Sequence, residues 1–363
     1  MRGEERRQRA MLVVFDVEQR VAKEHPLRRI KELVDAVLQE LSPLFDQMYS
    51  AVGRPSIPPE RLLKASLLMA LYTVRSERLF CEQLDYNFLF RWFLDLEVDE
   101  ASFDHSTFSR NRARLLEHAV AGEFFHAVVE QARTRKLLSD EHFTVDGTLV
   151  EAWASLKSFK RKDVGPSEPP DDPGNPTVNF RGERRSNATH QSTTDPEAQL
   201  AKKGAGKEAK LCYSAHALME NRNTILIDFQ VEPADGYAER RAAIAMVDER
   251  LPGRRRITLG GDKGYDTSDF VATCRTLTVT PHVARNLARA GGSALDARTV
   301  RHPGYDISQW IRKRVEEAFG WMKTIGGLRR TRYRGCERVQ MHAYLVAAAY
   351  NLIRIAKLCT APA

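Results

Sequence analysis

Residues 256–265, RITLGGDKGY, hold a short apolar stretch that ends in two glycines and a carboxylate. Ile257 and Leu259 are typical of a strand that enters a core, and Asp262 stands at the end of that strand. A strand end presents a side chain rigidly to a ligand, and Gly261 and Gly264 let the backbone turn closely around it. Asp and Gly are also frequent in plain turns. The stretch therefore predicts either a ligand-binding carboxylate or a simple turn.

The composition is that of a globular protein with a basic balance. The 363 residues are 42% hydrophobic, with a net charge of +8 at pH 7 and a pI near 9.2. Such a chain can form one large domain or two, and a polyanion is a plausible partner. The five cysteines are far apart and form no CxxC pair, which indicates neither a zinc site nor a disulfide framework. The charged N-terminus lacks the apolar core of a signal peptide, and no apolar run is long enough to cross a membrane, so we expect a cytoplasmic protein.

Residues 1–140 predict a helical N-terminal domain, which is a candidate for binding DNA ends. Pro58 and Pro59 can begin a helix whose apolar residues recur at helical spacing. Further along, FDHSTFSRNRARLLEHAV (103–120) places Ser106 as the expected N-cap of a basic helix that carries Arg110 and Arg112. These arginines could contact DNA, but a solvated basic face is equally consistent with the pattern.

Residues 141–363 predict a catalytic domain with a mixed sheet, interrupted by a flexible insertion at 155–210 that is rich in Pro, Ser and Gly. The pattern alternates strands and helices, which makes the fold class α/β (α+β). Expected strands cover 143–150, 211–220, 224–233, 256–261 and 279–284, and expected helices cover 239–250, 267–276 and a long run from Ser308.

Two further acids point to chemistry. Asp146 interrupts an otherwise apolar strand, which costs stability unless the carboxylate is solvated, paired or bound to metal. On the helix after Ser308, Arg312, Glu316 and Lys323 lie within roughly 40° of each other on one face. A surface ladder of ion pairs is the alternative for this face. If Asp146, Asp262 and Glu316 converge, their oxygens suit two Mg²⁺ or Mn²⁺ ions that promote phosphodiester cleavage.

Several long motifs strengthen that interpretation because they occur in a set order. This series resembles the bacterial insertion-sequence transposases of the DDE class, closest to the insertion-sequence-five family within the insertion-sequence-four group. The motifs are SIPPERLLKASLLMALY, DHSTFSRNR, VDGTLVEAWAS, RSNATHQSTTDPEAQLAKKGAGKEAKLCYSAHALMENRN, GDKGYDT and RKRVEEAFGWMKTIGGLRRTRYRG, within residues 52–358.

The resemblance implies a ribonuclease-H-like core in which Asp146, Asp262 and Glu316 are the catalytic metal ligands. The signature of the group is Tyr, two residues, Arg, three residues, Glu, six residues, Lys, and Gln309 stands here in place of the Tyr. The implied reaction binds and cuts the terminal inverted repeats in double-stranded DNA, then joins the freed 3′-hydroxyl to target DNA. A homo-oligomer on DNA, in a bacterial cytoplasm with nucleoid association, is also implied.

The remaining expectations concern DNA contacts and side chains near the core. We expect phosphate contacts from Arg312 and Lys323, and from Arg329, Arg330, Arg332 and Arg334 after the catalytic helix. His216 is expected to be a satisfied sheet histidine and Trp321 a core residue, whereas Trp153 could stack on a base. The alternatives are a catalytically silent DNA-binding descendant of a transposase, and a metal-dependent nuclease without strand transfer.

Overall fold

The computed structural model describes residues 16–49, 52, 56–162, 186–203, 207–251 and 256–359. Much of the expected insertion, including residues 163–185 and 204–206, lies outside this description. The described part of it forms short strands: β2 (Phe159–Arg161) pairs with β3 (His190–Ser192), and β4 (Gln199–Ala201) joins the main sheet.

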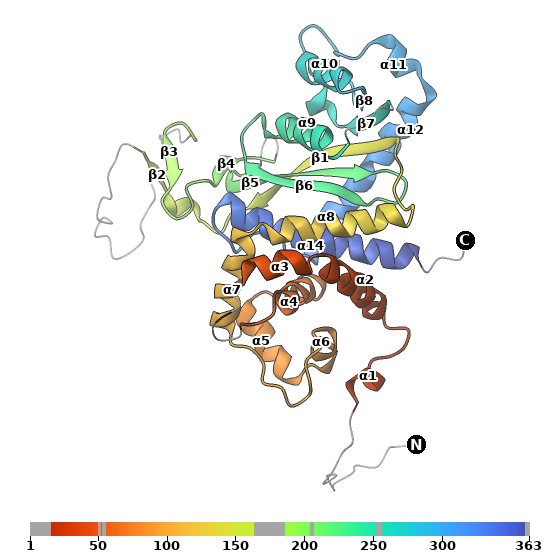
Figure 1. Cartoon of the computed structure of the whole chain (residues 1–363). Helices are drawn as coiled ribbons and strands as arrows, with labels where there is room; N and C mark the ends of the chain where they lie inside the picture. Colours follow the sequence, from red (N-terminus) through yellow and green to blue (C-terminus); the bar gives the residue numbers. More distant parts are fainter. Residues whose placement is uncertain are drawn as a thin grey trace, which may run out of the picture.

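A six-stranded mixed sheet forms the centre of the molecule (Figure 1). Its long strands are β1 (His142–Glu151), β5 (Lys210–Glu220), β6 (Leu226–Pro233), β7 (Ile257–Gly261) and β8 (Val279–Val283). β5 pairs with β1 and with β6, in both cases antiparallel, whereas β7 lies parallel to β1 and β8 parallel to β7. The spatial order β6-β5-β1-β7-β8 is consistent with a ribonuclease-H-like sheet, and each of these strands was predicted from the sequence.

Helices cover the sheet on both sides. Figure 1 shows α9 (Ala238–Arg250) above the antiparallel strands, and α8 (Val120–Thr134) and α14 (Cys336–Leu358) below them. The predicted helix at 239–250 is thus confirmed as α9, and that at 267–276 as α10 (Ser268–Thr276). Residues 345–352 of α14 are all buried, so the middle of this helix is enclosed on all sides.

The N-terminal helices pack beneath α8 and α14 (Figure 1). The helix α4 begins at Pro59 with Pro58 as its N-cap, as the sequence predicted. The basic helix α7 begins two residues earlier than expected, because Asp104, not Ser106, is the N-cap and accepts the capping bonds from the amides of Ser106 and Thr107. The helices of this part are α1 (Val17–Arg20), α2 (Pro26–Glu40), α3 (Ser42–Met48), α4 (Pro59–Leu71), α5 (Glu77–Tyr86), α6 (Phe88–Phe93) and α7 (His105–Glu117).

The long helix predicted from Ser308 begins earlier and is not continuous. α12 (Pro303–Ile311) passes through a single 3-10 turn, η3 (Arg312–Arg314), into α13 (Val315–Thr324). The remaining short elements are η1 (Leu156–Ser158), η2 (Lys263–Tyr265) and α11 (Ala297–Arg301). Within the described ranges, no helix has the length and apolar character needed to cross a membrane.

Two amide side chains of α14 take the place of a neighbouring strand along the open edge of β6. Asn351, which is fully buried, accepts from the amide of Leu226 at 2.9 Å and donates to its carbonyl at 2.8 Å. About three turns closer to the start of α14, Gln340 accepts from the amide of Val231 and donates to the carbonyl of Phe229. These bonds satisfy an edge that would otherwise carry buried, unpaired backbone groups.

Replacing Asn351 with alanine should therefore lower the free energy of unfolding by about 2–4 kcal/mol, since it leaves two buried backbone groups without partners. Urea denaturation of wild type, Asn351→Ala and the exposed α14 variant Arg338→Ala checks this. The Arg338 variant should unfold within about 0.5 kcal/mol of wild type. Equal losses from both substitutions would contradict the role given to Asn351.

Candidate functional site

Asp146 and Asp262 are brought side by side by the pairing of β1 with β7. The parallel register matches Thr144 with Gly260, and two further residues along each chain place Asp146 opposite Asp262. Neighbouring strands lie about 4.8 Å apart. Each carboxylate is anchored locally: Asp146 accepts from the amide of Gly147 at 2.9 Å, and Asp262 accepts from the amide of Gly264 at 2.6 Å. The sequence prediction that these two acids meet is consistent with this geometry.

The carboxylate of Asp146 is electrostatically strained. Burial, together with the charges of Asp262 and Glu239, raises its pKa to about 7, against a lowering by the hydrogen bond from the Gly147 amide and by Arg312. A carboxylate held in this way favours either a proton or a cation beside it. Carboxylate oxygens are the ligands that Mg²⁺ and Mn²⁺ prefer, so the pair fits an oxygen-coordinated divalent ion.

The face of β1 that carries Asp146 is the face that meets the helix α13. Alternate residues of a strand share a face, so Asp146 points to the same side as Thr144 and Thr148. The Nζ of Lys323 donates to Thr148 Oγ1 at 2.6 Å. Toward the start of β1, Thr144 pairs with Gly260 of β7. A Cβ placed on Gly260 would lie 3.3 Å from the Cβ of Arg312, so Arg312 packs against this position. Arg312 and Lys323 therefore bracket Asp146 along the strand.

Glu316 lies between these two cations in sequence and begins the first turn of α13. Its side chain is exposed. Among the described residues, no three Asp, Glu, His or Cys side chains converge closely enough to hold a metal ion. The structure thus brings together two of the three predicted acids and leaves the third on the adjacent helix.

Gln309, which replaces the signature tyrosine, holds Arg312 in place. Its amide nitrogen donates to the carbonyl of His282, at the end of β8, and its Oε1 accepts from Arg312 Nε at 3.0 Å. The helix α12 is thereby linked to the sheet beside the aspartates. The remaining guanidinium N–H groups of Arg312 are left for other acceptors.

A further acid, Glu239, was not identified from the sequence. It lies in the first turn of α9, and its carboxylate approaches the aspartates from the opposite face of β1. A Cβ on Gly147 would lie 2.9 Å from Glu239 Oε1, and a Cβ on Gly264 would lie 3.5 Å from Oε2. Burial and the charge of Asp262 raise the pKa of Glu239. Gly147, directly after Asp146, and Gly264, two residues after Asp262, were the sequence signal that another group comes close.

Two buried side chains beside these acids have no hydrogen-bond partner among the described residues. They are His216, with neither ring nitrogen bonded, and Tyr265, whose hydroxyl is unpaired. The prediction that His216 is a satisfied sheet histidine is therefore wrong in one respect, because it is buried but not satisfied. Burial lowers the pKa of His216 to about 4, so the ring is neutral.

The arginines after α13 lie beyond the end of β1. Arg330 donates to the carbonyls of Ala152 and Trp153 and stacks over the Trp153 ring at 5.4 Å. Arg329 and Arg334 are exposed, whereas Arg332 is partly buried. Trp321 packs partly buried against the core, as expected.

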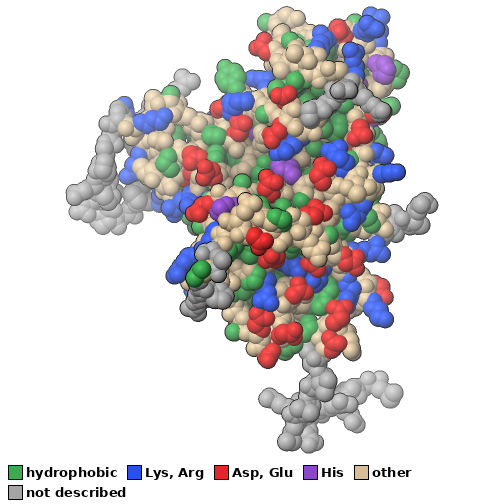
Figure 2. All heavy atoms as spheres, viewed as in Figure 1, with side chains coloured by type: hydrophobic (Ala, Val, Ile, Leu, Met, Phe, Trp, Pro, Cys, Tyr) green, Lys and Arg blue, Asp and Glu red, His purple; other side chains and the backbone are tan. Residues whose placement is uncertain are grey.

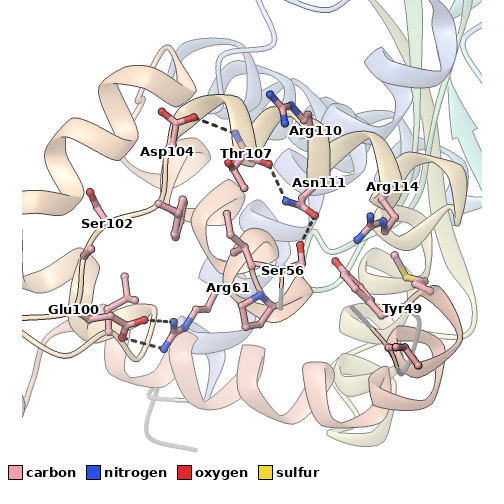
Figure 3. A pocket seen from close by; sticks show the side chains of 17 residues that line it. Tyr49, Ser56, Arg61, Glu100, Ser102, Asp104, Thr107, Arg110, Asn111 and Arg114 are labelled. Carbon is pink, nitrogen blue, oxygen red and sulfur yellow. Dashed lines mark hydrogen bonds and ion pairs between the residues drawn. The ribbon is translucent and has the colours of Figure 1, made fainter. Parts of the chain in front are cut away.

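The predicted DNA-contacting arginines of α7 have different environments. Arg112 pairs with Glu77 and stacks on the Tyr333 ring at 4.9 Å, so its guanidinium joins α7 to the catalytic part. Arg110 is exposed and lines a cavity of about 1380 Å³ in the N-terminal part (Figure 3).

That cavity is not strongly basic. In Figure 3, Arg61 is held by Glu100 on one side of the cavity, while Arg114 lies beside Tyr49 on the other. Asp104 adds a further acid to the lining. The outer surface in Figure 2 likewise intersperses basic and acidic side chains rather than gathering one sign.

The pH dependence of stability tests the strain on Asp146. The folded pKa near 7 lies above the value of about 3.9 in an unfolded chain, so the folded state binds more protons and loses stability as pH rises from about 4 to 7. In metal-free buffer, Asp146→Asn should therefore be more stable than wild type at pH 8, with the advantage gone near pH 4. Urea melts across this range check it, and a difference that does not change with pH would contradict it.

Comparison with known proteins bears on both parts of the chain. Residues 15–114 match a family described as "Transposase domain (DUF772)", and residues 184–352 match the "Transposase DDE domain" family, a range that includes Asp262 and Glu316 but not Asp146. No curated protein is significantly similar in sequence.

Among solved structures, a piggyBac transposase synaptic complex with hairpin DNA is 9% identical, with a TM-score of 0.40, over 91% of this chain and 75% of that one. A Mos1 transposase paired-end complex is 11% identical, with a TM-score of 0.20, over 86% and 80%. At these identities and TM-scores, both structures are only distantly similar to this chain. The two family matches, which lie in separate parts of the sequence, both indicate similarity to transposases, and the second indicates a DDE domain.

Proposed function

We propose that the protein cuts DNA at the terminal inverted repeats of an insertion sequence and joins the 3′-hydroxyl to target DNA. One observation carries the catalytic part of the proposal: Asp146 lies in register beside Asp262, on the face of β1 that Arg312 and Lys323 bracket. Cleavage of a phosphodiester needs this combination of an anionic ligand set for cations and basic groups for the phosphate.

Asp146, Asp262 and Glu316 would hold two Mg²⁺ or Mn²⁺ ions in this proposal. Bound ions of this kind activate the attacking oxygen and stabilise the leaving oxygen of an in-line displacement. Glu316 is in the first turn of α13, between Arg312 and Lys323 in the sequence, and its exposed side chain would have to turn toward the aspartates to join them. Glu239 approaches from the other face of β1 and is not assigned to this ligand set.

The cations beside the acids bind and orient the DNA. Arg312, held by Gln309, offers its free guanidinium N–H groups to a phosphate near the cut. Lys323, half-buried and fixed on Thr148, holds a second phosphate on the far side of Asp146. Arg329, Arg330, Arg332 and Arg334 extend these contacts along the strand, and Arg110 is the exposed candidate on α7.

Substitution of single acids distinguishes the proposed ligands from their neighbour. Asp262→Asn and Glu316→Gln should reduce Mg²⁺-dependent cleavage of inverted-repeat DNA to the level seen without metal, while leaving DNA affinity within about threefold of wild type. Glu239→Gln is the matched control and should retain most of the cleavage. Radiolabelled-DNA cleavage and electrophoretic mobility shifts measure the two properties.

The reverse pattern, with Glu239→Gln inactive and Glu316→Gln active, would move the third ligand from α13 to α9. Specific DNA binding without cleavage by wild type, under conditions in which an active DDE transposase cuts, would favour a catalytically silent DNA-binding protein. Cleavage without any joined product would favour a nuclease.

A further inference from the structure

A second cavity, of about 630 Å³, lies where the N-terminal helices meet the catalytic part. From the N-terminal side it is lined by Arg75, Glu77 and Arg112, and from the catalytic side by Trp153, the segment 323–333 and His342 of α14. Lys323, which is fixed beside the Asp146 face, lines the same cavity. The cavity therefore connects the candidate cleavage site with the N-terminal domain.

The lining of this cavity is strongly basic. Six cationic side chains and a single carboxylate, Glu77, face it. Glu77 already pairs with Arg112. Two of the other arginines are held by neutral acceptors: Arg332 Nη1 donates to the carbonyl of Arg75 at 2.7 Å, and Arg330 donates to the carbonyl of Trp153 at 3.0 Å. Their charges are thus left without a compensating anion in the lining.

The centre of the cavity wall is the ring of Tyr333. Arg112 and Arg332 stack on this ring at 4.9 and 5.1 Å, and the imidazole of His342 meets it edge-on at 5.2 Å. Stacking fixes the plane of each guanidinium. Arg112 is engaged by Glu77 and Arg332 Nη1 by the carbonyl of Arg75, so the N–H groups that remain for an oxyanion are the other ones of Arg332.

Two buried nitrogens in this wall have no partner among the described residues: Nε of Arg332 and Nδ1 of His342. A buried donor without an acceptor is costly, and such a group is expected to have a partner that is not part of the chain. Burial, with the nearby charges of Arg332 and Arg112, lowers the pKa of His342 to about 3, so this ring is neutral and adds hydrogen-bonding capacity rather than charge.

We propose that this junction cavity binds a backbone phosphate of the DNA on which the active site acts, with Arg332 as its principal donor. The inference rests on the proposed function, and it adds a defined phosphate site that both domains share. A polymeric anion fits better than free phosphate, because the basic residues of the lining include Lys323, beside the cleavage face, and Arg75 and Arg112 on the N-terminal side. DNA held here fixes the N-terminal domain relative to the cut.

DNA-binding measurements with the full chain test this site without relying on cleavage. Fluorescence anisotropy with a labelled inverted-repeat duplex, in EDTA, gives the affinity at several salt concentrations. Arg332→Gln should weaken binding about tenfold and reduce the slope of log K against log salt by about one. Arg332→Lys keeps the charge but loses the Nε–H donor, and its affinity should lie between those of wild type and Arg332→Gln.

The matched control is Arg133→Gln on α8, which removes an exposed arginine paired with Glu130 and should change neither quantity. Circular dichroism establishes that each variant is folded. If Arg332→Gln does not fold, Arg329→Gln, at an exposed position of the same lining, replaces it and should reduce the salt slope in the same way.

Three results would overturn the inference. An unchanged affinity and salt slope in folded Arg332→Gln and Arg329→Gln would show that no DNA phosphate binds there. Stabilisation of wild type but not Arg332→Gln by inorganic phosphate, with DNA binding unchanged, would assign the cavity to a free anion. An equal loss of affinity in Arg133→Gln would indicate a general effect of net charge. Failure of wild type to bind any DNA would instead be a failure of the proposed function.

Discussion

The parallel pairing of β1 with β7 is the constraint on which the candidate site depends. Its register sets which residue of one strand lies opposite which residue of the other, and a shift by one position would turn Asp146 away from Asp262. The pairing is fixed from both sides, since β5 holds the other edge of β1 and β8 the other edge of β7. Two carboxylates are thereby kept close together at a cost in electrostatic energy that a bound cation would relieve.

Strand alternation then divides the surroundings of the aspartates into two faces. The α13 face brings Arg312, Lys323 and, between them, Glu316, whereas the α9 face brings Glu239, the unpaired His216 and the glycine that lets them approach. The first face combines acids with cations that can bind phosphate. On the second face the nearby cation, Arg240 of α9, is held by the carbonyl of Gly264 beside Glu239. This difference is the reason for placing the DNA and the third ligand on the α13 face.

Much of the fold could be predicted from the sequence, because local periodicity determines individual elements. The strands from 143 to 283 and the helices α4, α9 and α10 were predicted within a few residues. The predictions that failed concern features that depend on tertiary contacts or on competition between neighbouring residues. Asp104 and Ser106 are both good N-caps, and the sequence does not say which one wins.

The site shows the same limit. Asp146 and Asp262 could be identified because acids are unusual at those positions of strands. Glu239 was missed because an acid in the first turn of a helix is ordinary, and only docking of α9 against Gly147 makes it notable. Arg112 contacts Glu77 and Tyr333, which are both far away in sequence. Its place at the domain junction could therefore not be predicted from the basic pattern of α7.

The most direct test of the central claim is a strand-transfer assay with purified protein, Mg²⁺ or Mn²⁺, a target plasmid and DNA that carries the inverted repeats flanking the gene. Wild type and Asp146→Ala are compared in parallel, with sequencing of any joined products. The account predicts joined 3′ ends from wild type in the presence of metal, and none from the variant or with EDTA. Joined products of equal yield from Asp146→Ala would contradict it, since the aspartate pair would then not be the catalytic centre.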